Sequence, residues 1–251
     1  MKLRYAALTD VGKKRNLNED SYLANGTIFA VADGMGGHRA GEVASVIALD
    51  ALRAGLGRRT KDPAEKRLID AIKFANKKVR EKAIRDRTRF GMGTTLTAAF
   101  LHGEKLYIGH VGDSRIYLLR DGKLKKLTND HSLVAQMVES GQLKPEEAEV
   151  HPHKSIITRA IGSEAEVEVD IAVEDIMDND RFLLCTDGLT TMLTDDEIAE
   201  VLKDIDDLNS ACRELVDWAN DRGGNDNITV ILLESKREPS ACFGRLWRTR
   251  R

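Results

Sequence analysis

The sequence predicts an α+β fold in which helices cover layers of antiparallel sheet. Short segments rich in β-branched and aromatic residues, bounded by turn residues, indicate strands. Two connections between these segments have the form of tight hairpins, which join antiparallel neighbours. Helical patterns occur in blocks between blocks of strands, without the regular alternation that is typical of a parallel sheet.

Eight segments are expected to form strands. Hairpins are expected at residues 101–106 and 119–124, and Asp121-Gly122 in the second is the two-residue signal for a type I′ turn. The expected strands span residues 3–8, 27–32, 94–101, 105–112, 115–120, 167–173, 181–186 and 228–234.

Three segments show the helical period of apolar residues. They span residues 41–56, 63–87 and 207–222, and Gly223-Gly224 is expected to end the last. The predicted inward face of the first carries Val43, Val46, Ile47, Ala51 and Leu52. The predicted inward face of the second helix carries Leu68, Ile72, Ala75, Val79 and Ala83. That of the third carries Leu208, Ala211, Cys212, Leu215 and Ala219.

Composition indicates a soluble protein whose function lies in a local site. The 251 residues suffice to bury a core, and a net charge of −2 from 39 basic and 41 acidic side chains gives no overall field for nucleic acid. Charges interrupt the N-terminus too early for a signal peptide, and no apolar run approaches the ~18 residues of a membrane span. Three distant cysteines, Cys185, Cys212 and Cys242, form no disulfide framework and favour a reducing cytoplasm.

The chain divides into a folded domain, residues 1–235, and a basic tail, residues 236–251. A polar stretch at 130–165 has a short helical start and reads as an insertion near a site. The tail is expected to be a linker or disordered extension. Attachment to an acidic partner or a membrane surface is the alternative, through Arg245, Trp247, Arg248, Arg250 and Arg251.

The glycine-rich segment FAVADGMGGHRAGE, residues 29–42, does not match a nucleotide-binding loop. Gly36 and Gly41 have the glycine spacing of a P-loop, but Glu42 stands where a lysine should neutralise phosphate. The dinucleotide pattern fails as well, because Arg39 occupies the place of its third glycine. These glycines are instead expected to let the backbone turn tightly beside a crowded site.

Several aspartates lie at the ends of apolar strands. Asp33, Asp113 and Asp187 each follow a predicted strand, and Asp226 precedes one. If they converge, their negative charges require a cation, and an all-oxygen ligand set suits Mg²⁺ or Mn²⁺ better than Zn²⁺. Arg15 lies nearby in the sequence, and an arginine fork beside such a site can bind a phosphate dianion. A surface salt bridge is the alternative for Arg15.

Eight short motifs along residues 3–234 resemble those of the metal-dependent serine/threonine protein phosphatases of the 2C type, the PPM family, particularly its bacterial members. That family's fold is a four-layer α-β-β-α sandwich of two antiparallel sheets, with a flap that corresponds to about residues 137–160. The motifs are RNLNED (15–20), VADGMGGH (31–38), GTT (93–95), GDSR (112–115), DHS (130–132), TRAIG (158–162), CTDGL (185–189) and DNIT (226–229).

The resemblance implies roles for individual residues. Asp33 bridges two metal ions, and the Gly34 carbonyl is a ligand of one of them. Asp187 and Asp226 complete the ligand set of the other ion, while Glu19 and Asp20 act largely through metal-bound water. Asp113, together with Asp187, corresponds to the site of a third, weaker ion. Arg15 binds the substrate phosphate.

The implied activity is hydrolysis of phosphoserine and phosphothreonine in proteins. Two bridged cations lower the pKa of the water between them, and the resulting hydroxide attacks phosphorus directly. The partners are phosphorylated proteins and an opposing Ser/Thr protein kinase, and the protein is expected to be a monomer. The alternative is a pseudophosphatase that serves as a binding or scaffold module.

The general acid is left open by the motifs. Animal members have a histidine directly after the Asp-Gly pair, where this chain has Met35. His38 is therefore the candidate general acid, with support of the loop as its other possible role. His131 is expected near the site, His110 in a structural position and Cys185 in the core. Thr94 and Thr95 are expected to pack beneath the metal centre without taking part in chemistry.

Overall fold

The computed structural model describes residues 2–36, 40–89, 91–149 and 151–236. Two five-stranded sheets stack on each other, and every strand pairing within them is antiparallel. The first sheet has the order β1 (Lys2–Asp10), β12 (Ile228–Lys236), β11 (Arg181–Cys185), β8 (Arg115–Arg120) and β9 (Lys123–Lys126). The second has the order β10 (Asp170–Asp175), β7 (Lys105–Val111), β6 (Leu96–His102), β3 (Ile28–Ala32) and β2 (Ser21–Ala24).

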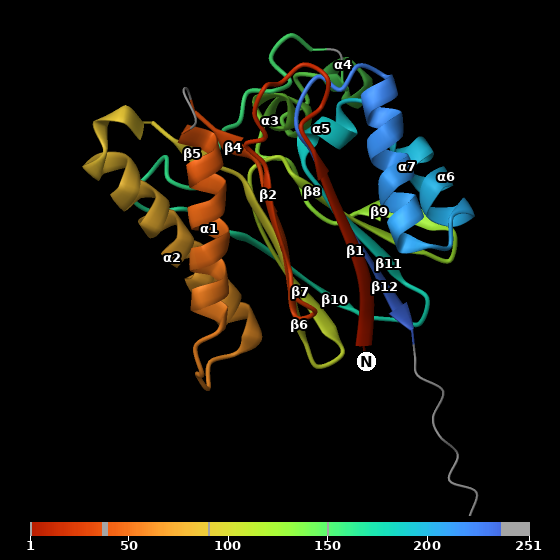
Figure 1. Cartoon of the computed structure of the whole chain (residues 1–251), viewed down its shortest axis with the longest axis horizontal. Helices are drawn as coiled ribbons and strands as arrows, with labels where there is room; N and C mark the ends of the chain where they lie inside the picture. Colours follow the sequence, from red (N-terminus) through yellow and green to blue (C-terminus); the bar gives the residue numbers. More distant parts are fainter. Residues whose placement is uncertain (1, 37–39, 90, 150, 237–251) are drawn as a thin grey trace, which may run out of the picture.

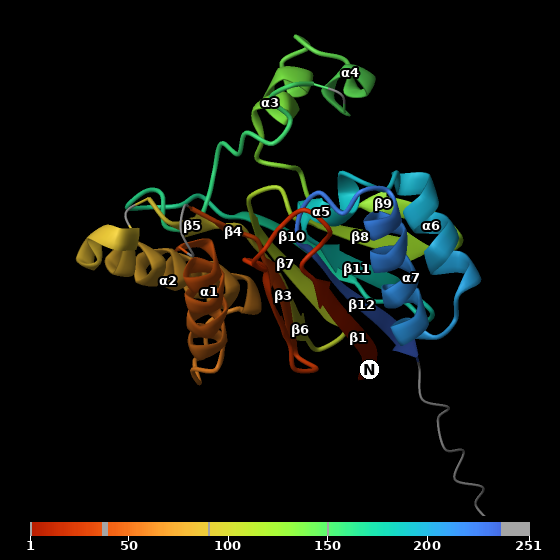
Figure 2. The same ribbon diagram turned by 45° about the horizontal axis from the view of Figure 1, so that its top comes forward.

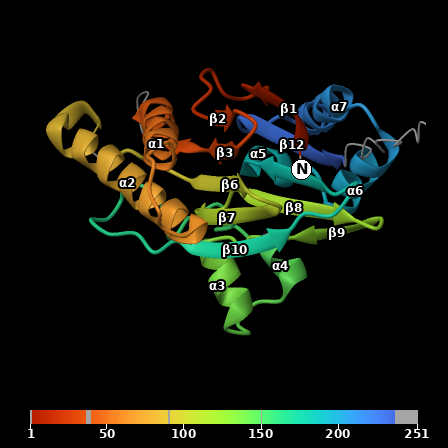
Figure 3. The same ribbon diagram turned by 90° about the horizontal axis from the view of Figure 1, so that it is seen from below.

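Helices form the outer layers of this sandwich (Figures 1 and 3). α1 (Ala40–Leu56) and α2 (Ala64–Arg85) cover the second sheet, and a short 3₁₀ turn (Arg87–Arg89) follows them. α5 (Asp187–Thr190), α6 (Asp195–Asp204) and α7 (Leu208–Asp221) cover the first sheet. A small pair, β4 (Gly34–Met35) and β5 (Gly93–Thr94), lies beside the N-terminal end of α1. The order of layers is helix, sheet, sheet, helix.

The segment between β9 and β10 stands apart from the sandwich. It carries α3 (Leu133–Glu139) and α4 (Pro145–Glu149), and Figure 2 shows both projecting from one end of the molecule. Ser132 caps α3 by accepting a hydrogen bond from the Ala135 amide. Few apolar residues of this segment are buried, which distinguishes it from the rest of the domain.

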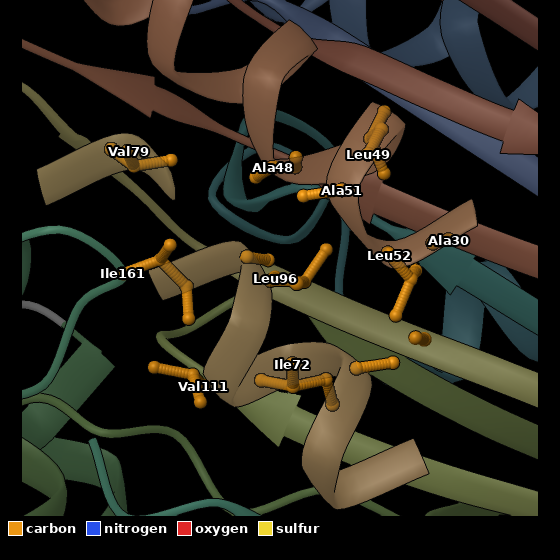
Figure 4. Packing of buried hydrophobic residues seen from close by; sticks show 14 of the residues in the cluster. Ala30, Ala48, Leu49, Ala51, Leu52, Ile72, Val79, Leu96, Val111 and Ile161 are labelled. Atoms are coloured by element: carbon orange, nitrogen blue, oxygen red, sulfur yellow. The ribbon is translucent and has the colours of Figure 1, made fainter. Parts of the chain in front are cut away.

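Three apolar clusters hold the layers together. One lies between the sheets, one beneath α1 and α2 (Figure 4), and one beneath α5, α6 and α7. Strand β12 contributes side chains to two of these clusters, because alternate side chains of a strand point to opposite faces. Val230 and Leu232 face the helices, whereas Ile231 and Leu233 face the other sheet.

The predicted fold class is confirmed, and each of the predicted strands and helices is present, with some differences in their bounds. In the second hairpin Asp121 and Gly122 have φ values of 50° and 71°, as a type I′ turn requires. The inward faces predicted for α2 and α7 are buried. The elements that were not predicted are β2, β4, α4, α5, α6 and the 3₁₀ turn, and β9 was expected only as the second arm of the hairpin at 119–124. The strand expected from residue 167 begins only at Asp170.

The predicted inward face of α1 was wrong in part. Val46 is 47% exposed, and Ala44, Ala48 and Leu49 are buried instead. Close packing of α1 on α2 explains the difference, since a Cβ added to Gly55 would lie 2.8 Å from that of Ala71. Small residues therefore form the contact, and the larger β-branched Val46 faces outward.

None of the described helices combines the length and apolar character needed to cross a lipid bilayer.

Candidate metal and phosphate site

The predicted acidic residues lie at one end of the two sheets. Asp33 follows β3, Asp113 follows β7, Asp187 follows β11 and Asp226 precedes β12. The strand register brings these ends together, because Cys185 pairs with both Val230 and Arg115 in the first sheet, and Leu96 pairs with Val111 in the second.

Asp33 occupies the middle of this cluster. Its pKa is raised well above the usual range, mainly by desolvation and then by the charges of Asp20, Asp187, Asp113 and Asp226. Desolvation and the charge of Asp226 raise the pKa of Asp187, and Asp33 partly lowers it. Such mutual effects require the carboxyl groups to be close. The convergence assumed from the sequence is therefore present.

The backbone around Asp33 is fixed by the start of β6. The Asp33 amide donates to Thr95 Oγ1 over 2.8 Å, and its carbonyl accepts from the Thr95 amide and from Thr94 Oγ1. Thr94 and Thr95 are fully buried. They hold the Asp33 backbone from a buried position.

Asp20 is anchored from the opposite sheet. Its Oδ2 accepts from Thr186 Oγ1 at 2.8 Å and from Thr229 Oγ1 at 2.7 Å, and the residue is only 7% exposed. Desolvation nevertheless raises its pKa to about 7. The two threonines were not predicted, and their signal in the sequence is a polar side chain placed at the end of an apolar strand.

Three of these carboxyl groups have a buried oxygen with no hydrogen-bond partner among the described residues: Oδ1 of Asp20, Asp113 and Asp187. Unpaired buried oxygens are costly, and hard divalent cations bind this type of ligand. The donor set therefore fits Mg²⁺ or Mn²⁺. No three acidic, histidine or cysteine side chains in the described ranges yet form an arrangement that could hold an ion.

The glycines bring backbones into contact around these acids. A Cβ on Gly34 would lie 2.2 Å from the Gly41 carbonyl oxygen, and one on Gly188 would lie 2.0 Å from that of Asn227. The first contact places β4 against the start of α1, and the second joins the segments that carry Asp187 and Asp226. The crowded turn predicted from the sequence thus serves the acidic cluster.

Arg15 and Glu19 lie at the rim. Arg15 Nη2 is 2.7 Å from Asp226 Oδ2, and the guanidinium side chain is 51% exposed. Desolvation raises the pKa of Glu19, and the backbone amides of Gly41 and Glu42, in the first turn of α1, partly lower it. Arg15 thus forms a salt bridge, but with a residue of the site, and its half-exposed guanidinium can also meet a ligand.

Comparison with known proteins agrees with this geometry, since the sequence model described as protein phosphatase 2C matches residues 13–232. This chain belongs to the protein phosphatase 2C family. The serine/threonine phosphatase stp of Listeria monocytogenes is 42% identical over 235 residues, which cover 90% of this chain and 93% of that protein.

Solved structures of phosphatases match the fold of this one. The serine/threonine phosphatase PstP/Ppp of Mycobacterium tuberculosis is 39% identical with a TM-score of 0.90, over 94% of this chain and 100% of that chain. The catalytic domain of PstP in complex with two manganese ions is 38% identical with a TM-score of 0.87, over 94% and 99%. The predicted metal-dependent protein phosphatase is confirmed.

The remaining site predictions for this phosphatase have different outcomes. His38 lies outside the described residues, as do residues 237–251 of the basic tail. His110 is buried and bonds Thr97 and the Asn129 carbonyl, as a structural residue would.

The DHS motif supports the loop that carries Asp113, a role missed in the sequence. Asp130 binds Arg115 through Nε and Nη2, the latter at 2.6 Å. His131 contacts Gly112 directly. Arg115 partly lowers the pKa of Asp113, which desolvation and Asp187 raise to about 8.

Proposed function

We propose that this phosphatase removes phosphate from phosphoserine and phosphothreonine in proteins, using Mn²⁺ or Mg²⁺. The observation that carries the proposal is the group of buried, unpaired carboxylate oxygens of Asp20, Asp113 and Asp187 beside Asp33. An uncompensated cluster of this kind is costly unless a cation neutralises it.

Asp33 would bridge two ions, and Asp187 and Asp226 would complete one of the sites. The Gly34 carbonyl would complete the other, with Glu19 and Asp20 acting through water. Asp113 and Asp187 would hold a third, weaker ion. When bound, divalent cations polarise the phosphate and acidify the attacking water.

Arg15 would orient the substrate phosphate. Its side chain is half exposed and is held beside the acidic cluster by Asp226, which supports an exchange of that ion pair for a phosphate dianion. A guanidinium binds two phosphate oxygens at once and thereby fixes the direction in which phosphorus faces the attacking water.

A covalent route through cysteine is not supported. Cys185 lies next to the site in the sequence but is fully buried, and desolvation raises the pKa of its thiol to about 12. Cysteine needs its thiolate form to act as a nucleophile. Direct hydrolysis is therefore the simpler mechanism.

The biological setting is also a proposal. Residues 1–235 would act as one catalytic domain and as a monomer, opposing a Ser/Thr protein kinase in the cytoplasm. The two described cysteines, Cys185 and Cys212, are both free and buried, which supports a reducing compartment. The scaffold alternative is not favoured, since Asp20, Asp33, Asp187 and Asp226 are all present.

Phosphate release from a phosphothreonine peptide and from p-nitrophenyl phosphate tests the function. We expect activity with Mn²⁺ or Mg²⁺, none with EDTA, and none in Asp33→Ala. Asp121→Ala is the matched control, because Asp121 lies in the β8–β9 turn and should leave turnover unchanged. Folded wild-type protein without activity under every metal condition would overturn the proposal.

A further inference from the structure

His131 holds both polar backbone groups of one glycine. The Gly112 amide donates to His131 Nδ1 over 3.0 Å, and the His131 amide donates to the Gly112 carbonyl over 2.7 Å. Gly112 immediately precedes Asp113 in the loop between β7 and β8. One side chain and one peptide thus fix the start of the Asp113 loop from both sides.

Gly112 has little freedom to move away. Its φ is +117°, and an added Cβ would lie 2.6 Å from Thr95 Cβ. On the far side of Asp113, Ser114 Oγ lies 2.8 Å from Thr95 Oγ1, which accepts the Asp33 amide. Contacts therefore run from His131 through the Asp113 loop to the backbone of Asp33.

The tautomer of His131 follows from its partners. Because Nδ1 accepts the Gly112 amide, the ring proton lies on Nε2, which is 3.2 Å from Asp170 Oδ2. Arg159 Nη1 also lies 3.0 Å from this nitrogen, but because Nε2 is protonated it cannot accept, and Arg159 donates to the other Asp170 oxygen. Desolvation lowers the pKa of His131, and Asp170 opposes it while Arg159 adds to it, so the ring is neutral near pH 7.

The same histidine is joined to the projecting segment. The Thr158 amide donates to the His131 carbonyl over 2.8 Å, and Ser132 forms a β-bridge with Ile157. Residues 157–159 are the point at which the chain returns from α3 and α4 to the sandwich. The two hydrogen bonds between His131 and Gly112 therefore lie at the base of the projecting segment.

We propose that His131 is a positioning residue for the phosphatase reaction, in which its Nδ1 holds Gly112 so that the Asp113 carboxylate faces the site, and Asp170 sets the required tautomer. This inference rests on the proposed function, because Asp113 matters there as a ligand. The ring of His131 contacts the backbone of Gly112, so its role is to position Asp113 and not to touch the substrate.

Two substitutions of His131 separate positioning from packing. His131→Asn keeps an acceptor at the place of Nδ1, whereas His131→Gln moves its amide to the place of Nε2. We expect H131N to keep kcat within about threefold of wild type and H131Q to lose about tenfold, the value of one hydrogen bond, with KM unchanged. His102→Gln, at the exposed end of β6, is the control and should match wild type.

Metal binding and NMR provide readouts that do not depend on activity. Calorimetry should show weaker Mn²⁺ binding by H131Q than by H131N, and ¹⁵N chemical shifts of metal-free wild type should show an unprotonated Nδ1 and a protonated Nε2. Equal kcat and Mn²⁺ affinity of the two variants would overturn the inference. A proton on Nδ1 in wild type would overturn it even if H131Q did not fold. Inactive wild type would instead contradict the proposed function.

Discussion

Asp20 illustrates how single residues prepare the site. One carboxylate oxygen accepts from two threonines, and the other is buried without a partner. The threonines hold the side chain in one orientation, so the free oxygen has a defined direction. Hydrogen bonds from Thr186 and Thr229 also favour the charged form that a cation requires, against the desolvation that raises the pKa.

Thr229→Val tests this arrangement. Removing the hydroxyl leaves the buried Asp20 oxygen with one donor fewer, so we expect a loss of about 1–3 kcal/mol in the free energy of unfolding. Mn²⁺ affinity should fall as well. Urea unfolding and calorimetry measure the two effects, and Thr27→Val at an exposed position is the control. Unchanged stability and affinity would show that the hydroxyl does not hold Asp20.

Arg15→Ala tests the phosphate-binding role. If the guanidinium binds phosphate in the ground state, KM should rise about tenfold or more while kcat changes little. Steady-state kinetics with a phosphothreonine peptide measures both. Arg53→Ala removes a comparable surface pair, with Asp50, far from the site in the fold and should change neither constant. A fall in kcat at constant KM would mean that Arg15 acts only in the transition state.

At the scale of elements, the site depends on close contact between the segments that end or begin at the same edge of the sheets. Gly188 lies in α5, directly after Asp187, and touches the Asn227 carbonyl at the start of β12. This contact sets the separation of Asp187 and Asp226. Any side chain at Gly188 must push the two segments apart.

Gly188→Ala should therefore reduce kcat and Mn²⁺ affinity by tenfold or more, because an added Cβ would lie 2.0 Å from a backbone oxygen. Gly103→Ala is the control. A Cβ added at Gly103, in the β6–β7 turn, meets no atom within 4 Å. The substitution should therefore cost only about 1–2 kcal/mol of left-handed backbone strain. Thermal unfolding and calorimetry distinguish the two. A Gly188→Ala protein with wild-type metal affinity would contradict the contact argument.

The elements found from the sequence are those with strong local signals. Apolar runs ending in Asp-Gly predicted β3 and β11, and the same pattern predicted the acidic site. Strand β9, with the sequence KLKK, has no apolar alternation of its own. The hairpin predicted at 119–124 required a second strand there, but only the pairing with β8 shows its extent. In contrast, α6 begins with a capping box, Thr194 with Glu197, which the sequence does contain.

The supports of the site were harder to predict than its acids. Thr186 and Thr229 reach Asp20, and His131 reaches Gly112, only through the strand register and the loop contacts. No spacing in the sequence marks them as partners. The acids themselves could be predicted because each has its own strand as a local signal.

At the scale of the whole molecule, the two sheets bring together carboxylates that repel each other. The stability of the metal-free protein should therefore depend on pH. The pKa of Asp20 is raised to about 7 and that of Asp113 to about 8, so these two groups bind more protons in the folded state than in the unfolded chain between about pH 4 and 8. Their contribution to stability is therefore lost as pH rises through these values.

His110 and His131 act in the opposite sense below about pH 6.5, because desolvation lowers their pKa values, that of His110 to about 4. Between pH 6.5 and 8.5 the change in stability therefore comes from the two aspartates and not from these histidines. In EDTA we expect the free energy of unfolding to fall across this range by at most about 1.4 kcal/mol per pH unit for each proton released. Excess Mn²⁺ should abolish the fall. Urea unfolding at several pH values measures it, and increasing stability in EDTA would contradict the prediction.

The central claim is that the acids at the joined end of the two sheets bind the cations on which the reaction depends. The most direct measurement is a crystal structure of the protein grown with Mn²⁺, with anomalous differences collected at the manganese edge. The account predicts anomalous peaks in contact with carboxylate oxygens of Asp33 and Asp187. Peaks confined to other surfaces, or no peak beside Asp33, would contradict it.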